Sequence, residues 1–262
     1  MTHTLKAVLK SIGFIALYVF INTIILLGYF IVSGTQDLEA VSPNAMTAML
    51  IATQLIVLMM ILLLYKKQFT SVVRFRKTSP KILIWSFIIG FAAINISALL
   101  LSVMDVLFPQ QMADYIEAIE GSIGGANILL SFTAVVILAP LVEEIAMRGM
   151  LFRWFERTAI KPWLLVVLSG LFFGLFHLNL IQGVFTSVIG MVYALGFLMT
   201  KSLWVPIVMH FANNLYAITA SYLPEPLIES LWFTLFSYLM ILLVPIGLYQ
   251  INKALKTQTA TD

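Results

Sequence analysis

Long apolar runs recur along nearly the whole chain, and they constrain its fold more than any other feature. A helix that crosses a lipid bilayer needs about 20 predominantly apolar residues. Eight runs approach or reach that length, and they cover residues 11–31, 45–65, 82–104, 128–147, 163–178, 184–200, 203–222 and 231–250. The sequence therefore predicts an all-α, polytopic membrane protein with a bundle of about eight transmembrane helices. Because no internal repeat and no long linker separates the runs, we expect a single transmembrane domain over residues 1–262.

Charged residues are too few to give this chain a water-soluble surface. They make up 10% of the sequence, whereas an ordinary soluble domain carries about 25%. This excludes a soluble globular enzyme, a disordered chain and a nucleic-acid-binding protein. The absence of cysteine also excludes disulfides, thiolate metal sites and a cysteine nucleophile. The first run is longer than the core of a signal peptide, about 7–15 residues, so we expect it to be retained as a membrane span.

The charged residues sort to opposite sides of an eight-helix chain. All 15 Lys and Arg residues fall before the first run, after the eighth, or in the loops that share that side. The loops on the other side carry acids and no base: Asp37, Glu39, Asp105, Asp114, Glu117, Glu120, Glu225 and Glu229. The positive-inside rule then predicts that both termini are cytoplasmic. The acidic stretch 105–120 predicts a short surface helix after Pro109 within a solvated loop.

Two adjacent carboxylates, Glu143 and Glu144, interrupt the fourth apolar run. A charged side chain near the centre of a span costs about 2.5–3.5 kcal/mol on insertion scales, so both are functional candidates. Glu144 precedes Arg148 by four residues on one helical face, which predicts an ion pair, whereas Glu143 points about 100° away and stays free to exchange protons. Pro140 removes a backbone hydrogen bond and predicts a kink beside Glu143. Alternatively, the pair lies at the cytoplasmic end of the helix and only marks the water interface.

Two of the three histidines lie inside apolar runs. His177 follows Phe173 by four residues and His210 precedes Asn214 by four, so the members of each pair share a helical face. We expect Phe173 to hold the His177 ring by packing and Asn214 to share a cavity with His210. Together with Glu143, these groups on three helices predict one shared site. A lone intramembrane histidine can, however, serve only as a hydrogen bond between helices.

The inventory of polar groups favours hydrolysis of a peptide bond by activated water. A glutamate can act as general base toward water, while histidine and asparagine can donate hydrogen bonds to the oxyanion that forms at the attacked carbonyl. Glu143, His177 and His210 are also an acceptable set of zinc ligands with an open fourth position. Neither an HExxH nor a GxSxG motif occurs. Two other functions stay open: a proton-coupled transporter, for which internal repeats would be expected, and a non-catalytic immunity or scaffold protein.

These segments resemble the CPBP family, also called Abi, which comprises the type II CAAX prenyl endopeptidases and their bacterial relatives. Three family motifs occur in order within residues 127–222, and the matching residues are, for EExxxR, Glu143, Glu144 and Arg148; for FxxxH, Phe173 and His177; and for HxxxN, His210 and Asn214.

The resemblance implies an intramembrane endopeptidase with four catalytic residues and three supporting ones. The catalytic residues would be Glu143, His177, His210 and Asn214, supported by Glu144, Arg148 and Phe173. Whether one divalent metal such as zinc takes part, held by Glu143, His177 and His210, is left open by the resemblance. The short chain and lean loops resemble the bacterial branch in a cell membrane, where the substrate would be a bacteriocin, a signalling-peptide precursor or a lipidated tail, and where some members confer immunity.

The placement of the fifth apolar run raises a question of depth. Gly170 and Gly174 form a GxxxG motif that predicts close helix packing. His177 lies about 21 Å along this helix from its start, at 1.5 Å per residue, whereas the run boundaries put Glu143 close to the cytoplasmic end of the fourth run. For the two to meet, the fourth helix must extend or lie deeper, or the fifth must tilt or begin outside the hydrocarbon. Residues 149–158 could then form an amphipathic segment in the inner leaflet.

Overall fold

The computed structural model describes residues 2–38, 40–121 and 125–259, and these residues form helices and connecting turns without any strand. The N-terminal helices are α1 (His3–Ser33), α2 (Pro43–Tyr65), η1 (Lys66–Gln68), α3 (Phe69–Val73), α4 (Pro80–Leu107) and α5 (Pro109–Ile119). One long helix follows in five consecutive segments: α6 (Ile128–Ser131), η3 (Phe132–Leu138), α7 (Ala139–Glu144), η4 (Ile145–Leu151) and α8 (Phe152–Phe155). The C-terminal helices are α9 (Pro162–Phe176), α10 (Leu180–Thr200), α11 (Trp204–Ala220), α12 (Glu225–Ile228), α13 (Leu231–Met240) and α14 (Leu243–Thr259).

Six helices of the described chain are long and apolar enough to cross a membrane: His3–Ser33, Pro43–Ser71, Pro80–Leu107, Ile128–Phe155, Leu180–Thr200 and Leu231–Gln258. Each of them contains or overlaps one of the predicted runs. The runs at 163–178 and 203–222 correspond to α9, with 15 residues, and α11, with 17 residues, and both are shorter than these six. The all-helical, multi-pass membrane character is therefore confirmed, and the count of eight spans stays a prediction.

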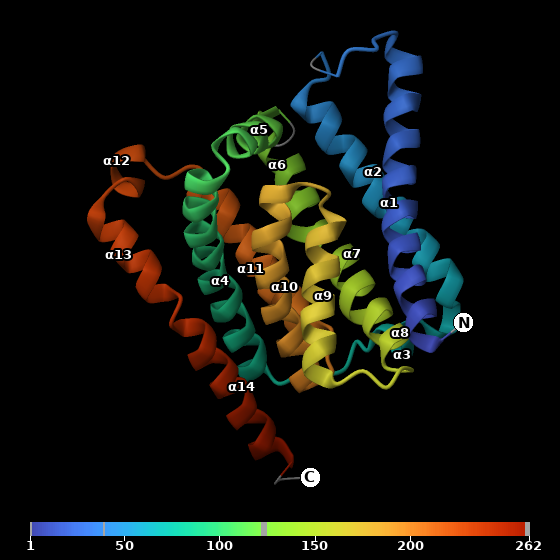
Figure 1. Ribbon diagram of the computed structural model, residues 1–262, viewed down its shortest axis with the longest axis vertical. Coiled ribbons are helices and arrows are strands. Elements are labelled where there is room, and N and C mark those ends of the chain that lie inside the picture. Colours follow the sequence, from blue (N-terminus) through green and yellow to red (C-terminus); the bar gives the residue numbers. More distant parts are fainter. Residues whose placement is uncertain (1, 39, 122–124, 260–262) are drawn as a thin grey trace.

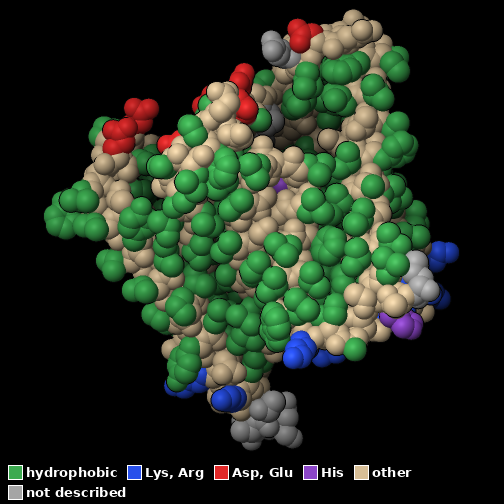
Figure 2. All heavy atoms as spheres, in the orientation of Figure 1, with side chains coloured by type: hydrophobic (Ala, Val, Ile, Leu, Met, Phe, Trp, Pro, Cys, Tyr) green, Lys and Arg blue, Asp and Glu red, His purple; other side chains and the backbone are tan. Residues whose placement is uncertain are grey.

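The charged side chains gather at opposite ends of the helix bundle. Figure 2 shows acidic side chains at the end where α5 and α12 lie, and basic side chains at the other end. Figure 1 shows that α1 begins and α14 ends toward the basic end. We call these the acid end and the basic end. This separation agrees with the predicted sorting of charges, while the side of the membrane on which each end lies stays a prediction.

Helix α9 packs closely on α10 because small residues line the contact. A side-chain carbon added to Gly170 would collide with the backbone carbonyl of Ser187, and one added to Gly174 would collide with the Ser187 side chain and the Gly183 backbone. Small residues of this kind allow helix backbones in membranes to approach each other. The GxxxG motif is therefore a packing device, as predicted.

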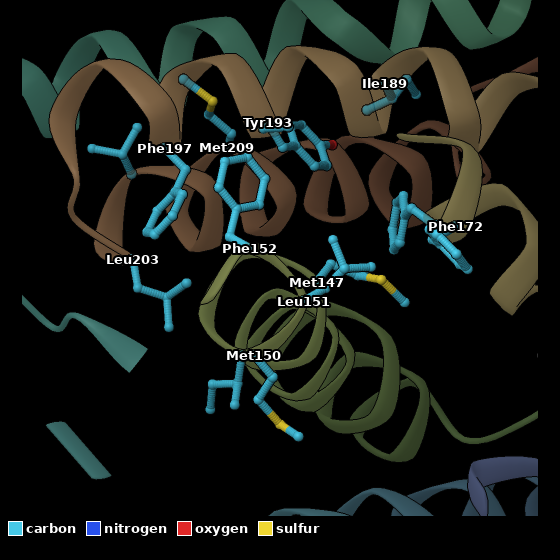
Figure 3. Close-up of a cluster of buried hydrophobic side chains, with 14 of the residues drawn as sticks. Met147, Met150, Leu151, Phe152, Phe172, Ile189, Tyr193, Phe197, Leu203 and Met209 are labelled. Atoms are coloured by element: carbon cyan, nitrogen blue, oxygen red, sulfur yellow. The ribbon is translucent and has the colours of Figure 1, made fainter. Parts of the chain in front are cut away.

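The long helix Ile128–Phe155 carries the two adjacent carboxylates through the middle of the protein. Its C-terminal part packs its apolar side chains against α9, α10 and α11, and Figure 3 shows this buried cluster. Phe152 of this helix meets Phe197 of α10 edge-on, with ring centroids 5.0 Å apart. The segment at 149–155 is thus a buried continuation of the helix and not an amphipathic segment in the inner leaflet.

This extension answers the question of depth. Glu143 lies 12 residues before the helix end at Phe155, and His177 lies 15 residues after the start of α9 at Pro162. At 1.5 Å per residue these separations are about 18 Å and about 22 Å. Because a short turn joins the two helices, both side chains can lie at a similar height above it.

The long helix contains two segments of π-helix, which flank α7. The amide of Ala139 donates five residues back, to the carbonyl of Ala134, and Pro140 follows at the start of α7. Proline has no N–H and its ring crowds the preceding turn, so the wider π-turn accommodates it. A change in helix type, of a kind often found at functional sites, therefore accompanies Pro140 beside Glu143, and the kink itself stays a prediction.

Candidate active site

A fully buried ion pair forms the base of the site. The side chains of Glu144 and Arg148 have no exposed surface, and Arg148 Nη1 lies 3.0 Å from Glu144 Oε1. Arg148 Nη2 also donates a hydrogen bond of 2.6 Å to the backbone carbonyl of Gly190 in α10. The predicted pair is present, and its burial is inconsistent with the alternative that it marks a water interface. It ties the long helix to α10.

Aromatic rings enclose the Arg148 guanidinium. Its central carbon lies 5.0 Å from the ring centroid of Phe173 and 5.7 Å from that of Tyr193, within the range of cation–π attraction. The Phe173 ring also meets His177 edge-on at 5.0 Å and His210 at 5.6 Å between centroids. Phe173 therefore packs against His177 as predicted, and it also contacts Arg148 and the second histidine.

The two histidine rings are each held at Nδ1. His177 Nδ1 lies 2.8 Å from the carbonyl oxygen of Phe173, and His210 Nδ1 lies 3.0 Å from Glu144 Oε1. Carbonyl and carboxylate oxygens only accept, so both Nδ1 atoms carry the hydrogen in these bonds. In a neutral ring this leaves Nε2 of each histidine with its lone pair free to accept a proton.

Glu143 faces the other side of the His210 ring. Its Oε2 lies 3.9 Å from His210 Nε2, and the residue is 9% exposed. This is longer than a hydrogen bond, so the two groups are neighbours without a direct bond. His210 therefore lies between the two carboxylates, bonded to Glu144 through one nitrogen and next to Glu143 through the other.

Asn214 anchors α11 to the π-helical segment of the long helix. Its Nδ2 donates a hydrogen bond of 2.8 Å to the backbone carbonyl of Val135, and its Oδ1 accepts one of 3.2 Å from Asn213. One of the two hydrogens on its Nδ2 remains available to a ligand. Asn214 and His210 line the same cavity, as predicted.

That cavity has a volume of about 380 Å³, and it extends from the two histidines toward the acid end. Its inner wall includes Phe173, His177, Tyr193, His210, Asn213 and Asn214, and its outer part includes Tyr115, Ile119, Ser221 and Tyr222. Helix α5 contributes Tyr115 and Ile119, and Tyr115 packs on Phe185 of α10 at 6.2 Å. The short helix after Pro109 is therefore present, but it covers the cavity and does not belong to a merely solvated loop. The sequence pattern did not predict that Tyr115 and Ile119 of this helix contribute to a cavity.

The structure also assembles polar groups that the sequence did not single out. Asn213 and Tyr193 line the cavity beside His210, Ser97 of α4 faces them, and the carbonyl of Gly190 binds Arg148. Asn213 is a polar residue in an apolar run, directly beside Asn214, and that pattern could have identified it. No local pattern points to Tyr193, Ser97 or Gly190, because their roles arise from contacts between distant helices.

The three candidate zinc ligands are not assembled as a metal site. Across the ranges that the structure describes, no three His, Cys, Asp or Glu side chains are grouped so that they could hold a metal ion. His177 and His210 each donate a hydrogen bond from Nδ1, so Nε2 is the ring nitrogen with which either could bind a metal, and Glu143 Oε2 lies 3.9 Å from Nε2 of His210. Because the described residues do not bring Glu143, His177 and His210 together as a set of three ligands, no chemical step below depends on a metal ion.

Comparison with known protein families matches one segment of the chain. Residues 125–216 match the family model described as Rce1-like, "Type II CAAX prenyl endopeptidase Rce1-like". All the residues of the three motifs fall within this range. No curated protein and no solved structure matched the chain.

Proposed function

We propose that this chain, whose segment 125–216 matches the Rce1-like type II CAAX prenyl endopeptidase model and whose motifs resemble those of the CPBP family, is an intramembrane endopeptidase that hydrolyses a peptide bond of a membrane-associated substrate. The observation that supports this most directly is the position of His210, which lies between Glu143 and the Glu144–Arg148 pair beside a cavity that also reaches His177. Membership of a protease family agrees with peptidase chemistry. The buried acid, bases and amide supply what water-mediated hydrolysis needs.

In this mechanism Glu143 acts as general base, with His177 as a second acceptor close to the reacting water. Glu143 takes a proton from water while the water oxygen bonds to the substrate carbonyl carbon. When the tetrahedral intermediate collapses, the C–N bond breaks and the proton passes from Glu143 to the leaving amine. The other fragment is released as a carboxylic acid, so that one water molecule is consumed for each bond broken.

His210 and Asn214 stabilise the oxyanion of that intermediate. Asn214 donates through its remaining amide hydrogen, and His210 donates from Nε2 when its ring is protonated. Glu144 stabilises the protonated ring, because its negatively charged carboxylate accepts a hydrogen bond from Nδ1. With both carboxylates ionised, Arg148 and the protonated His210 balance the two negative charges, so the site is neutral overall. Arg148 and Phe173 are positioning residues here, because they hold Glu144 and the histidines and do not contact the reacting atoms.

The wider setting of the reaction follows from the charge distribution and the family resemblance. We place the protein in a bacterial cell membrane as eight spans, with α9 and α11 as the short fifth and seventh, and both termini on the cytoplasmic side. The substrate is then a bacteriocin, a signalling-peptide precursor or a lipidated tail. The lipid bilayer is the other partner.

Cleavage by the purified protein in liposomes tests this proposal. A mixture of synthetic apolar peptides is incubated with wild type and with Glu143→Gln, and the products are read by mass spectrometry. Loss of a general base lowers the rate by about 10²- to 10⁴-fold, so we expect Glu143→Gln to lose nearly all cleavage. Glu229→Gln changes an exposed glutamate after α12 and serves as the matched control that keeps activity. Equal processing by wild type and Glu143→Gln would refute the role of Glu143 as general base, and processing by neither would favour a scaffold or a transporter.

A further inference from the structure

Three buried polar atoms of the cavity wall lie outside the catalytic scheme and have no hydrogen-bond partner among the described residues. They are Ser97 Oγ in α4, Tyr193 Oη in α10 and Asn213 Oδ1 in α11. These residues are 2%, 1% and 8% exposed, and all three line the same cavity. Three helices thus each contribute one residue with such an atom to the wall of one space.

Unpaired polar atoms at this depth are costly to the fold. Most buried polar atoms have a hydrogen-bond partner, and leaving one without a partner costs about 1–3 kcal/mol. These three atoms belong to residues that line one cavity, so a single ligand could pair with all of them. One such ligand accounts for them more simply than three unrelated unpaired groups would.

The side-chain amide of Asn213 presents an acceptor to this cavity, and the neighbouring bonds determine its orientation. The carbonyl of Val135 can only accept, so the Asn214 amide turns its nitrogen toward Val135 and its oxygen toward Asn213. The Asn213 nitrogen then donates to that oxygen, and Asn213 Oδ1 is left as an acceptor without a donor. The hydroxyls of Tyr193 and Ser97 can each donate.

The rest of the wall is apolar and uncharged. Ile94, Leu101, Phe185, Ile189, Ala217 and Ile218 supply much of the remaining surface. In the described part of the chain, no Asp, Glu, Lys or Arg side chain lines this space. An apolar wall with one acceptor and two donors fits an extended peptide with apolar side chains, since its main chain carries both N–H and C=O groups. A lipid tail has no groups for these atoms.

The cavity opens toward the acid end of the protein. Its inner wall, at Tyr193 and His210, is buried, whereas Ser221 and Tyr222 beyond the end of α11 are exposed. Helix α5 covers this part through Tyr115 and Ile119. A chain segment can therefore reach the histidines from the acid end, and Figure 1 shows α5 at that end.

We propose that Ser97, Tyr193 and Asn213 form a binding subsite for the main chain of an apolar peptide that enters the cavity from the acid end. Asn213 accepts from a peptide N–H, and the hydroxyls of Tyr193 and Ser97 donate to peptide carbonyls. The subsite rests on the proposed function, since it would present an extended peptide to the histidines. Combined with cytoplasmic termini, it selects substrates that expose their apolar segment on the non-cytoplasmic side.

Binding can be measured without cleavage, because the chain has no native cysteine. Ile218→Cys places a single thiol in the cavity wall, one helical turn from Asn214, in a Glu143→Gln background that prevents turnover. The labelling rate by a methanethiosulfonate reagent is measured in liposomes with increasing amounts of a neutral, capped nonapeptide of leucine and alanine. Two further probes serve as comparisons: the same peptide with all amide nitrogens methylated, and hexadecanol.

We expect the nonapeptide to slow labelling and the methylated peptide to protect poorly, because it cannot donate to Asn213. One lost hydrogen bond weakens binding about 2- to 12-fold, and this is the expected effect of Tyr193→Phe, Ser97→Ala or Asn213→Leu. Because Tyr193 Oη and Ser97 Oγ have no protein partner to lose, the first two variants keep or raise the melting temperature. Asn95→Leu is the matched control, since Asn95 is a buried asparagine of α4 that lines a different pocket.

Two results would overturn the subsite: equal protection by hexadecanol or the methylated peptide, or unchanged peptide affinity in all three variants. Failure of the proposed function gives a different pattern. In that case the wild type cleaves no peptide, while protection by the nonapeptide and its loss in the variants are still observed.

Discussion

Replacing Arg148 by methionine tests whether the buried ion pair holds the site together. The change leaves the Glu144 carboxylate, which has no exposed surface, without its cation. Breaking a buried pair from one side costs about 3–5 kcal/mol, because an uncompensated charge remains in the interior. The same change removes the hydrogen bond to the Gly190 carbonyl and the contact with two aromatic rings, each worth about 1 kcal/mol. We therefore expect Arg148→Met to lower the free energy of unfolding by about 5–7 kcal/mol.

The assay is unfolding in mixed detergent micelles, followed by tryptophan fluorescence and analysed as a double-mutant cycle. Glu144→Gln keeps an oxygen that can accept from His210 Nδ1 but removes the charge, so the double variant with Arg148→Met leaves no buried ion unpaired. A buried pair replaced on both sides is often close to neutral, so the double variant should be more stable than Arg148→Met alone, with a coupling of about 2–3 kcal/mol.

A surface pair provides the control for this experiment. Arg74 and Glu156 lie 2.5 Å apart, but their side chains are 21% and 30% exposed. Exposed pairs contribute about 0–1 kcal/mol, so Glu156→Gln should change the unfolding free energy by less than that. The reasoning is refuted if Arg148→Met costs no more than Glu156→Gln, or if the effects of Glu144→Gln and Arg148→Met simply add.

Three further predictions concern packing, orientation and metal. Gly174→Ala places a side-chain carbon against Ser187 and should destabilise the protein by about 1–3 kcal/mol in the same unfolding assay, whereas Gly28→Ala, which meets no atom within 4 Å, should be neutral or stabilising. Single cysteines in place of Ser71 and of Ser221 should react with a membrane-impermeant thiol reagent from opposite sides of oriented vesicles, and labelling of both from one side would contradict the proposed topology. Peptide cleavage should persist after treatment with EDTA or 1,10-phenanthroline, and full inhibition that zinc reverses would show that the histidines rearrange to bind metal.

Contacts within one helix could be predicted from the sequence because helical geometry relates spacing to direction. The Glu144–Arg148 pair is separated by four residues and Gly170 and Gly174 share a face, so both features followed from a period of 3.6 residues per turn. The membrane class followed in the same local way, because the length and apolarity of a run decide whether it can span a bilayer.

Contacts between helices depend on how each helix is rotated about its axis and how deep it lies. Neither the rotation nor the depth can be obtained from the spacing of residues along the chain. The motif residues could be grouped as one site, but the bond from His210 to Glu144, the position of Glu143 on the other side of that ring and the bond from Arg148 to Gly190 could not be derived. The buried extension of the fourth helix to Phe155 decides the depth at which these groups meet.

The sequence by itself determined that this chain is a helical membrane protein, which of its polar residues are candidates for a functional site and which of them pair along one helix. Only the tertiary structure decided that Tyr193, Ser97 and Asn213 line the same cavity as the histidines, and that α5 covers its outer part. The physical reason is that local hydrophobicity and periodicity specify each helix separately. Which side chains share a space is decided by close packing of helices that are distant in sequence, as where α9 rests on α10 at Gly170 and Gly174.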